Sequence, residues 1–238
     1  FPGSPCRRFF RLPGQTSDRI SGRSFMALPI HLKSDKGESI VFEDVSWKFY
    51  EAFNDDLIDT PSRISYDGRT LEIPMTLSIE HEKFKAFLAS IVDRAAEAFN
   101  VQMVCGGSAT LKSSRAGKGL EADECFWIEH AAAVQTVDRL DLEIHPAPDL
   151  VIEVDVTHST VDRESIYASI GVPEMWHFDV ATRLTGWVLS GGTWQRAEFS
   201  RAFPALRVSD LNVFIDRFGR GENATTVRRE LRMWLESL

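Results

Sequence analysis

The chain has only three cysteines among its 238 residues, and this scarcity excludes several classes of protein. Cys6, Cys105 and Cys125 include no C-x-x-C pair, so they offer neither a typical zinc site nor a dithiol redox motif. Their odd number also argues against a disulfide framework and favours a reducing, cytoplasmic location. We therefore expect Cys105 and Cys125 to be small residues of the core.

Long apolar runs and an excess of positive charge are also missing. No apolar stretch approaches the roughly 20 residues of a membrane-spanning helix, so we expect no membrane association. The formal net charge is −8 at pH 7, which does not favour binding of a polyanion over the whole surface. A nucleic-acid partner would need a local basic patch or a bound metal ion.

The first 25 residues differ from the rest in composition. They carry five arginines and a single acid, Asp18, and they include neither an initiating Met nor the apolar region of a secretory signal. We expect residues 1–25 to be a disordered N-terminal extension, either an unfolded arm or an upstream part of the reading frame with Met26 as the true start. The alternative is an Arg-rich arm for targeting or for nucleic-acid binding.

The apolar patterns predict a single α/β domain with a mixed central β-sheet flanked by helices. Helices are expected over residues 45–54, 78–99, 160–170 and 224–238. Strands are expected over residues 64–66, 70–73, 101–105, 109–111, 123–128, 142–144, 150–156, 175–178, 184–189 and 193–199. Asp67-Gly68 indicates a hairpin turn, and residues 112–119 are expected to form a polar loop.

The stretch PDLVIEVDVT, residues 148–157, is the most informative part of the chain. It is apolar on both faces of a strand except at Glu153 and Asp155, which point to the same face. Two buried like charges are costly unless a cation neutralises them, and Mg²⁺ or Mn²⁺ prefers such oxygen ligands. Asp123, at the start of another strand, could join the same site. An ion-pair network with Lys112, Arg139 or Arg163 is the structural alternative.

Several motifs together carry a resemblance to a known family. They are GLEADECFWI at 119–128, PDLVIEVDVT at 148–157 and IYASIGVPEMW at 166–176, with ISYDGRTLEI at 64–73 and SIEHE at 78–82 upstream. This set resembles the putative restriction endonuclease family of the PD-(D/E)xK nuclease superfamily. The resemblance implies a restriction-endonuclease-like domain over residues 26–238. It also implies a Mg²⁺-dependent (or Mn²⁺-dependent) endonuclease that hydrolyses DNA phosphodiester bonds, and a homodimer.

The resemblance also implies roles for individual residues. Asp123 and Glu153 would be catalytic acids that bind the metal. The acid or histidine that the family places on a neighbouring helix matches Glu80 or His81. Helical geometry supports both, since Glu80 and His81 each share a face with apolar residues, although both side chains could simply lie in the first helical turn.

The chain departs from the superfamily pattern at the lysine that helps to activate water. Asp155 occupies that position, and Arg163 occupies the helical position where related sequences carry a lysine. Arginine can stabilise phosphate charge but stays protonated. We therefore include Asp155 and Arg163 among the expected catalytic residues. The rival hypothesis is a catalytically impaired nuclease-fold protein that acts as a DNA-binding or regulatory partner.

Three basic residues precede Asp123 and could contact the phosphate backbone. They are Lys112, Arg115 and Lys118. The alternative for these residues is a solvated loop. The sequence does not distinguish DNA from RNA as the substrate.

Overall fold

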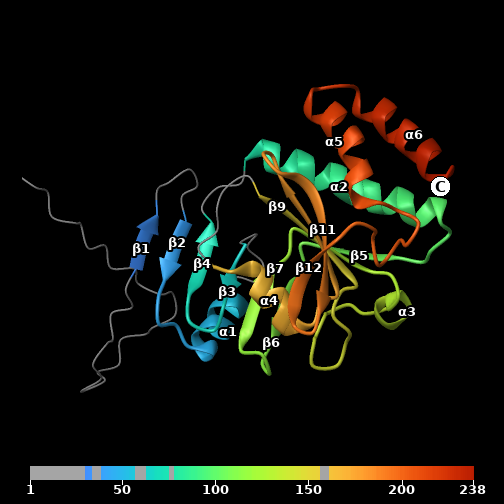
Figure 1. The fold of residues 1–238 in the computed structure, drawn as a ribbon. Coiled ribbons are helices and arrows are strands. Elements are labelled where there is room, and N and C mark those ends of the chain that lie inside the picture. Colours follow the sequence, from blue (N-terminus) through green and yellow to red (C-terminus); the bar gives the residue numbers. More distant parts are fainter. Residues whose placement is uncertain (1–29, 34–38, 57–62, 75–77, 156–160) are drawn as a thin grey trace, which may run out of the picture.

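The computed structural model describes residues 30–33, 39–56, 63–74, 78–155 and 161–238. The expectations for residues 1–25 lie outside these ranges. Within them the chain forms two six-stranded sheets flanked by helices, so the mixed α/β class is confirmed (Figure 1). The strands divide over two sheets where one central sheet was expected. Among the described residues, no helix is both long and apolar enough to cross a membrane.

The first sheet is antiparallel throughout and has the strand order β1-β2-β4-β3-β7-β6. Its strands are β1 (Ile30–Lys33), β2 (Ser39–Phe42), β3 (Ser65–Tyr66), β4 (Leu71–Pro74), β6 (Thr110–Ser113) and β7 (Lys118–Glu121). The β3–β4 hairpin confirms the turn predicted at Asp67-Gly68. Gly68 has φ +103°, and Oδ1 of Asp67 accepts the Thr70 N–H at 2.7 Å.

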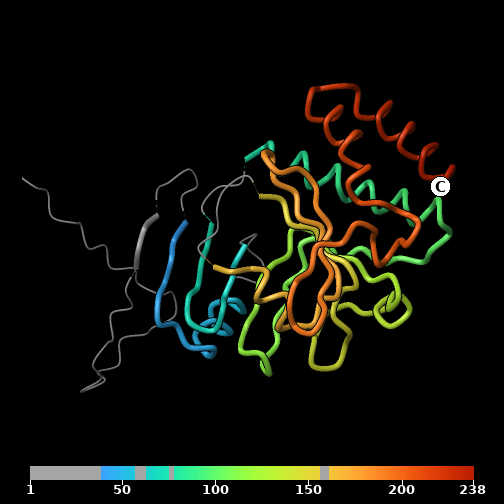
Figure 2. Tube along the Cα trace, viewed as in Figure 1, coloured from blue at the N-terminus to red at the C-terminus, as the bar shows by residue number. Residues whose placement is uncertain are grey.

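The second sheet carries the motifs that define the candidate site. Its order is β12-β11-β10-β9-β8-β5, and it is mixed because β9 and β10 are parallel while the other pairs are antiparallel. Its strands are β5 (Val104–Gly107), β8 (Glu124–Trp127), β9 (Leu150–Asp155), β10 (Glu174–Asp179), β11 (Arg183–Ser190) and β12 (Thr193–Ala197). After α2 (Ile79–Ala98) the chain enters this sheet at β5, returns to the first sheet for β6 and β7, and comes back at β8 (Figure 2).

The helices are α1 (Trp47–Asp56), α2 (Ile79–Ala98), α3 (Ala131–Val134), α4 (Arg163–Ile170), the 3₁₀ turn η1 (Val208–Leu211), α5 (Asn212–Gly219) and α6 (Ala224–Leu235). The helix α1 packs against the first sheet, and other helices cover both faces of the second sheet. The helices α2, α5 and α6 pack together over one face, as Figure 1 shows, while α4 lies on the other side, against β6, β7 and β12. The strand β9 is therefore covered from both directions.

The two faces of β9 belong to two different apolar clusters. Leu150, Ile152 and Val154 pack with α2, α5 and α6, whereas Val151 packs with α4. Aromatic rings fill the first cluster, where Phe87 of α2 stacks on Phe218 at a centroid distance of 4.2 Å. Burial of these side chains is the main stabilising contribution to the fold.

Three local expectations are corrected by the structure. Residues 112–119 are not a loop, because β6 and β7 pair as a hairpin that turns at residues 114–117. Residues 142–144 form a turn rather than a strand, since the Ile144 N–H bonds to the Asp141 carbonyl at 3.2 Å. The helix expected from Thr160 begins at Arg163, with Asp162 as its N-cap, and Thr160 lies outside the described residues.

Candidate active site

The two acids expected to act together are placed side by side by the pairing of β8 with β9. Asp123 immediately precedes β8, in which Glu124 lies opposite Ile152 of β9. The next position along this antiparallel register sets Asp123 beside Glu153. The Asp123 side chain reaches β9 directly, because its Oδ2 accepts the Val154 N–H at 2.7 Å. Both acids are buried.

Asp123 is bonded to Arg63 as well as to the backbone, and His81 lies beside both. Arg63 donates through Nη2 to Oδ1 of Asp123. His81 is in the first turn of α2, and its Nε2 lies 3.1 Å from Oδ2 of Asp123 and 3.0 Å from Nη1 of Arg63. Ser78 begins this helix as predicted, since its Oγ accepts the His81 N–H at 3.0 Å. The alternative helical residue, Glu80, is exposed.

The protonation of His81 follows from these neighbours. Burial and the positive charge of Arg63 lower the pKa of His81 below its usual value, so the ring is neutral at pH 7. Because a guanidinium can only donate, Nε2 of His81 accepts from Arg63, and Nδ1–H donates to Glu82 at 3.0 Å. Nε2 of His81 and Oδ1 of Asp123 therefore both accept from Arg63, through its Nη1 and Nη2 respectively.

Glu153 is held by a second arginine. Arg163, at the start of α4, donates to Oε2 through Nε and to Oε1 through Nη2, each at 2.8 Å. The Tyr167 hydroxyl donates to Oε1 as well. Arg163 uses its remaining donors on Oγ of Ser65 at 2.6 Å and on the Glu121 carbonyl at 2.7 Å, so it ties α4 to both β3 and β7.

Buried charge controls the protonation of this second cluster. Burial opposes the charge on Arg163, but the attraction of Glu153 outweighs it and raises the pKa of Arg163 above its usual value. Burial, reinforced by Glu153, raises the pKa of Tyr167, so its hydroxyl stays protonated and donates. Burial lowers the pKa of Arg63, an effect that Glu153 partly opposes. Arg63 thus bonds to Asp123 and is also attracted by Glu153.

Glu121 is a further acid that the sequence analysis did not identify. It ends β7, and its backbone N–H bonds to the Ile64 carbonyl at 3.0 Å, which places it next to Arg63. Burial raises the pKa of Glu121 to about 7, although the charges of Arg63 and Arg163 oppose this shift. A carboxyl group that titrates near neutral pH thus borders the Asp123–Glu153 pair.

Asp155 has a different partner from Glu153, although both lie on one face of β9. Its Oδ2 lies 2.9 Å from Nε2 of His177 on the adjacent strand β10. The parallel register sets His177 beside Glu153. The hydrogen bond to Asp155 is the largest cause of a raised pKa at His177.

The three basic residues expected to contact substrate are placed differently from one another. Lys118 donates to Oγ of Ser165 at 2.9 Å, so it lies beside the first turn of α4, near Arg163. Lys112 turns toward α1 and pairs with Asp55 at 3.3 Å. Arg115 lies in the turn between β6 and β7. The structure therefore places Lys118 beside the helix turn that carries Arg163 and directs Lys112 toward α1.

The donor atoms around Asp123 and Glu153 fit a hard divalent cation in their chemistry. They comprise carboxylate oxygens and one neutral imidazole nitrogen, and each carboxylate already holds a guanidinium as a positive partner. Because the arginines occupy these carboxylates, an ion at Asp123 and Glu153 would require Arg63 or Arg163 to move.

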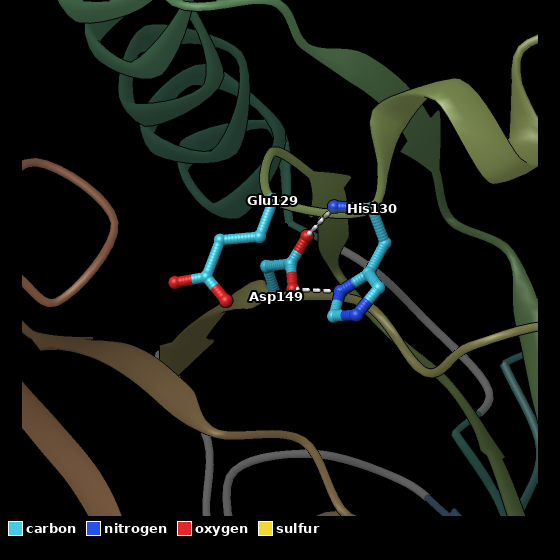
Figure 3. Close-up of side chains that lie close together, drawn as sticks. All are labelled: Glu129, His130 and Asp149. Carbon is cyan, nitrogen blue, oxygen red and sulfur yellow. Dashed lines mark hydrogen bonds and ion pairs between the residues drawn. The ribbon is translucent and has the colours of Figure 1, made fainter.

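A compact set of three donors, with all ligand atoms within 4.8 Å, occurs elsewhere in the described part of the chain, at Glu129, His130 and Asp149 (Figure 3).

The Glu129–His130–Asp149 cluster has a structural explanation. Oδ2 of Asp149 accepts the backbone N–H groups of Ile128 at 2.7 Å and His130 at 3.0 Å. Its Oδ1 accepts from Nδ1 of His130 at 2.6 Å, and Glu129 pairs with Arg201 at 3.1 Å. Asp149 thus fixes the turn that follows β8, and its hydrogen-bonding capacity is largely used.

Some of the residues now found at the site had a readable signal in the sequence. Tyr167 follows Arg163 by four positions, so the two share one face of α4. Arg63 had no comparable signal, because it lies outside every predicted element and reaches Asp123 across 60 positions. His177 sits among apolar strand residues, and its link to Asp155 depends on the pairing of β9 with β10.

Comparison with known protein families identifies the class of this chain. The family model for Uma2, described as putative restriction endonuclease, matches residues 47–214. The chain therefore belongs to this family.

Two other comparisons were with curated proteins and with solved structures. No curated protein matches the chain. Among solved structures, the chain is similar to the crystal structure of a putative nuclease belonging to DUF820 from Anabaena variabilis. The TM-score is 0.46 and the sequence identity is 14%, over 66% of this chain and 95% of that one.

Proposed function

We propose that this protein is a divalent-metal-dependent endonuclease that hydrolyses phosphodiester bonds in DNA. One observation carries the proposal: two buried acids on adjoining strand ends, Asp123 and Glu153, are each neutralised by a cationic side chain. Carboxylates brought together at adjoining strands provide the hard oxygen ligands that Mg²⁺ and Mn²⁺ prefer, so their presence beside each other supports a role in binding a cation. Membership of the Uma2 family supports the same reaction class.

Asp123 and Glu153 would hold the metal, with His81 as a further donor. Such an ion, Mg²⁺ or Mn²⁺, supplies positive charge for the phosphoryl oxygens and activates water. His81 offers Nε2 in the neutral state, and Glu82 fixes its tautomer by accepting from Nδ1. Arg63 would leave Asp123 when the cation binds, since both occupy the same carboxylate.

The remaining residues would bind and orient the phosphate. Arg163 has a fixed fork of donors and remains protonated, so it can stabilise negative charge but cannot accept a proton. Tyr167 keeps its hydroxyl proton and orients Glu153. Lys118 could guide the backbone toward α4, and Arg115 at the hairpin turn could contact a more distant phosphate.

A second candidate function is a nuclease-fold protein that binds DNA or regulates a partner without cutting. The observation in its favour is that the oxygens of Asp123 and Glu153 are already satisfied by arginines, a tyrosine and a backbone N–H. Asp155 also stands where the superfamily pattern has lysine. This candidate predicts binding to DNA that needs neither metal nor the two acids.

Cleavage of supercoiled plasmid in Mg²⁺ or Mn²⁺ tests the proposal. We expect EDTA to abolish cleavage, and we expect Asp123→Asn and Glu153→Gln each to lower the rate by roughly 100-fold. That factor corresponds to about 3 kcal/mol of lost transition-state stabilisation. A single-stranded RNA of matched length, tested beside the plasmid, separates DNA from RNA as substrate.

The matched control is Glu129→Gln, which alters the exposed acid of the other donor cluster. It should leave cleavage unchanged, and Mn²⁺ binding measured by calorimetry should be lost in Asp123→Asn but kept in Glu129→Gln. Cleavage that survives both active-site substitutions would refute the assignment. Tight DNA binding without cleavage by the wild type would favour the second candidate. Analytical ultracentrifugation measures whether the protein is a homodimer, and an assay for cleavage of both DNA strands tests whether the dimer acts on both.

A further inference from the structure

A second charged pair lies next to Glu153, on the same face of the sheet. Asp155 follows Glu153 by two positions on β9, and His177 stands beside Glu153 on β10. Nε2 of His177 and Oδ2 of Asp155 are 2.9 Å apart. The site therefore contains an imidazole, oriented by a carboxylate, within one strand spacing of an expected metal ligand.

The hydrogen bond fixes which nitrogen of His177 is available. Ionised Asp155 can only accept, so Nε2 of His177 carries the proton and Nδ1 of the neutral ring bears the lone pair. Among the residues that the structure describes, Nδ1 has no hydrogen-bond partner. The side chain is 24% exposed, so water can reach it.

Hydrolysis needs a proton acceptor, and the residues at the lysine positions of the pattern cannot serve. Arg163 stays protonated, and Asp155 is occupied by His177. We propose that His177, oriented by Asp155, is the general base that takes the proton from the attacking water. This inference rests on the proposed nuclease function and adds a catalytic residue to it, with Asp155 as a positioning residue.

The step balances without a further reagent. The water oxygen forms a bond to phosphorus while one water proton passes to Nδ1 of His177. The bond from phosphorus to the leaving ester oxygen breaks, and its electron pair remains on that oxygen, which takes a proton from solvent. The imidazolium then returns its proton to solvent. Asp155 stabilises the imidazolium through Nε2–H.

The charges around His177 are mostly negative. Asp155 and Glu153 approach it from β9, Glu164 from α4 and Asp179 from its own strand, while its partner on β11 is the uncharged Thr185. Arg163 on α4 is held by Glu153. Hydrogen bonding to Asp155 raises the pKa of His177 above its usual value.

Chemical rescue of plasmid cleavage by the full-length protein tests the inference. We expect His177→Ala to lower the rate by about 100-fold and to flatten its pH dependence. Added imidazole should restore part of the rate, whereas a purely structural role would not be rescued. Asp155→Asn should lower the rate less, because His177 remains. His177→Gln keeps a donor to Asp155 and serves if the alanine variant does not fold.

His130→Gln is the matched control, because His130 pairs with Asp149 in the same way outside the site. It should cleave normally and show no response to imidazole. If wild type cleaves and His177→Ala or His177→Gln cleaves within about threefold of it, the inference fails while the nuclease function stands. Loss of activity without rescue, together with an unchanged pH profile, also overturns it. A wild type that does not cleave overturns the nuclease function and this inference with it.

Discussion

The two faces of β9 carry opposite chemistry over the same few residues. Leu150, Ile152 and Val154 form one face and are buried under α2, α5 and α6. Glu153 and Asp155 lie on the other face, after Val151, and meet α4 and β10. One strand thus supplies apolar burial on one side and a charged site on the other. The backbone of β9 therefore fixes the distance between the apolar core and the charged side chains.

This difference shows that the charged face depends on pairing rather than on apolar burial. A buried ion pair contributes little net stability compared with apolar residues, but removal of one partner leaves an uncompensated charge. Arg163 is the central partner, because it also bonds to Ser65 and to the Glu121 carbonyl.

Substitution of Arg163 by Met should have the largest effect. It keeps a long apolar stem but leaves Glu153 buried without its cation, so we expect the free energy of unfolding to fall by about 3–5 kcal/mol. Urea unfolding followed by far-UV circular dichroism measures this change.

The double variant Arg163→Met, Glu153→Gln is the control for that prediction. It removes both charges, so most of the lost stability should return. If the single variant loses less than about 1 kcal/mol, the pair is not the support of the charged face, and the contrast with the apolar face fails.

Glu121→Gln should have a smaller effect that depends on pH. The folded-state pKa of Glu121 is raised to about 7 from 4.5, so the folded state binds the proton more tightly than the unfolded state does. Wild-type stability therefore falls as pH rises from 4.5 to 7 and stays lower above it. We expect Glu121→Gln to be more stable than wild type by about 1–2 kcal/mol at pH 8, with allowance for solvent near this half-buried group.

Thermal unfolding at pH 5 and pH 8 checks the sign. The advantage of Glu121→Gln should nearly vanish at pH 5, where the wild-type carboxyl is protonated in the fold. Glu236→Gln, which alters an exposed acid on the last helix, should change stability little at either pH. An equal gain at both pH values would show that Glu121 is not titrating near neutrality.

The sequence predicted the parts of this contrast that depend on local periodicity. The alternation in residues 150–156 placed Glu153 and Asp155 on one face of a strand, and β9 occupies residues 150–155. Ser78 as the cap of α2 and the turn at Asp67-Gly68 are confirmed for the same reason, since each depends on neighbouring residues.

Contacts between distant segments could not be predicted in this way. Nothing near Arg63 in the sequence indicates that it reaches Asp123 and His81, because that contact requires the first sheet to stand beside α2. The helical segment at residues 208–219 is different, because its signal was present in the sequence and was not used. Apolar residues repeat there at helical spacing, namely Leu211, Phe214, Ile215 and Phe218.

Ile152→Val should have the smallest effect and should separate the two faces most clearly. It removes one methylene from the apolar face, so we expect a loss of about 1 kcal/mol in the free energy of unfolding. Ile152 points away from Glu153, and the backbone that carries Glu153 and Asp155 is unchanged, so plasmid cleavage should stay within about twofold of wild type. Urea unfolding and cleavage kinetics on the same preparation measure both quantities. A fall in cleavage much larger than the fall in stability would mean that packing against α2 sets the position of Glu153, and the two faces would then not be independent.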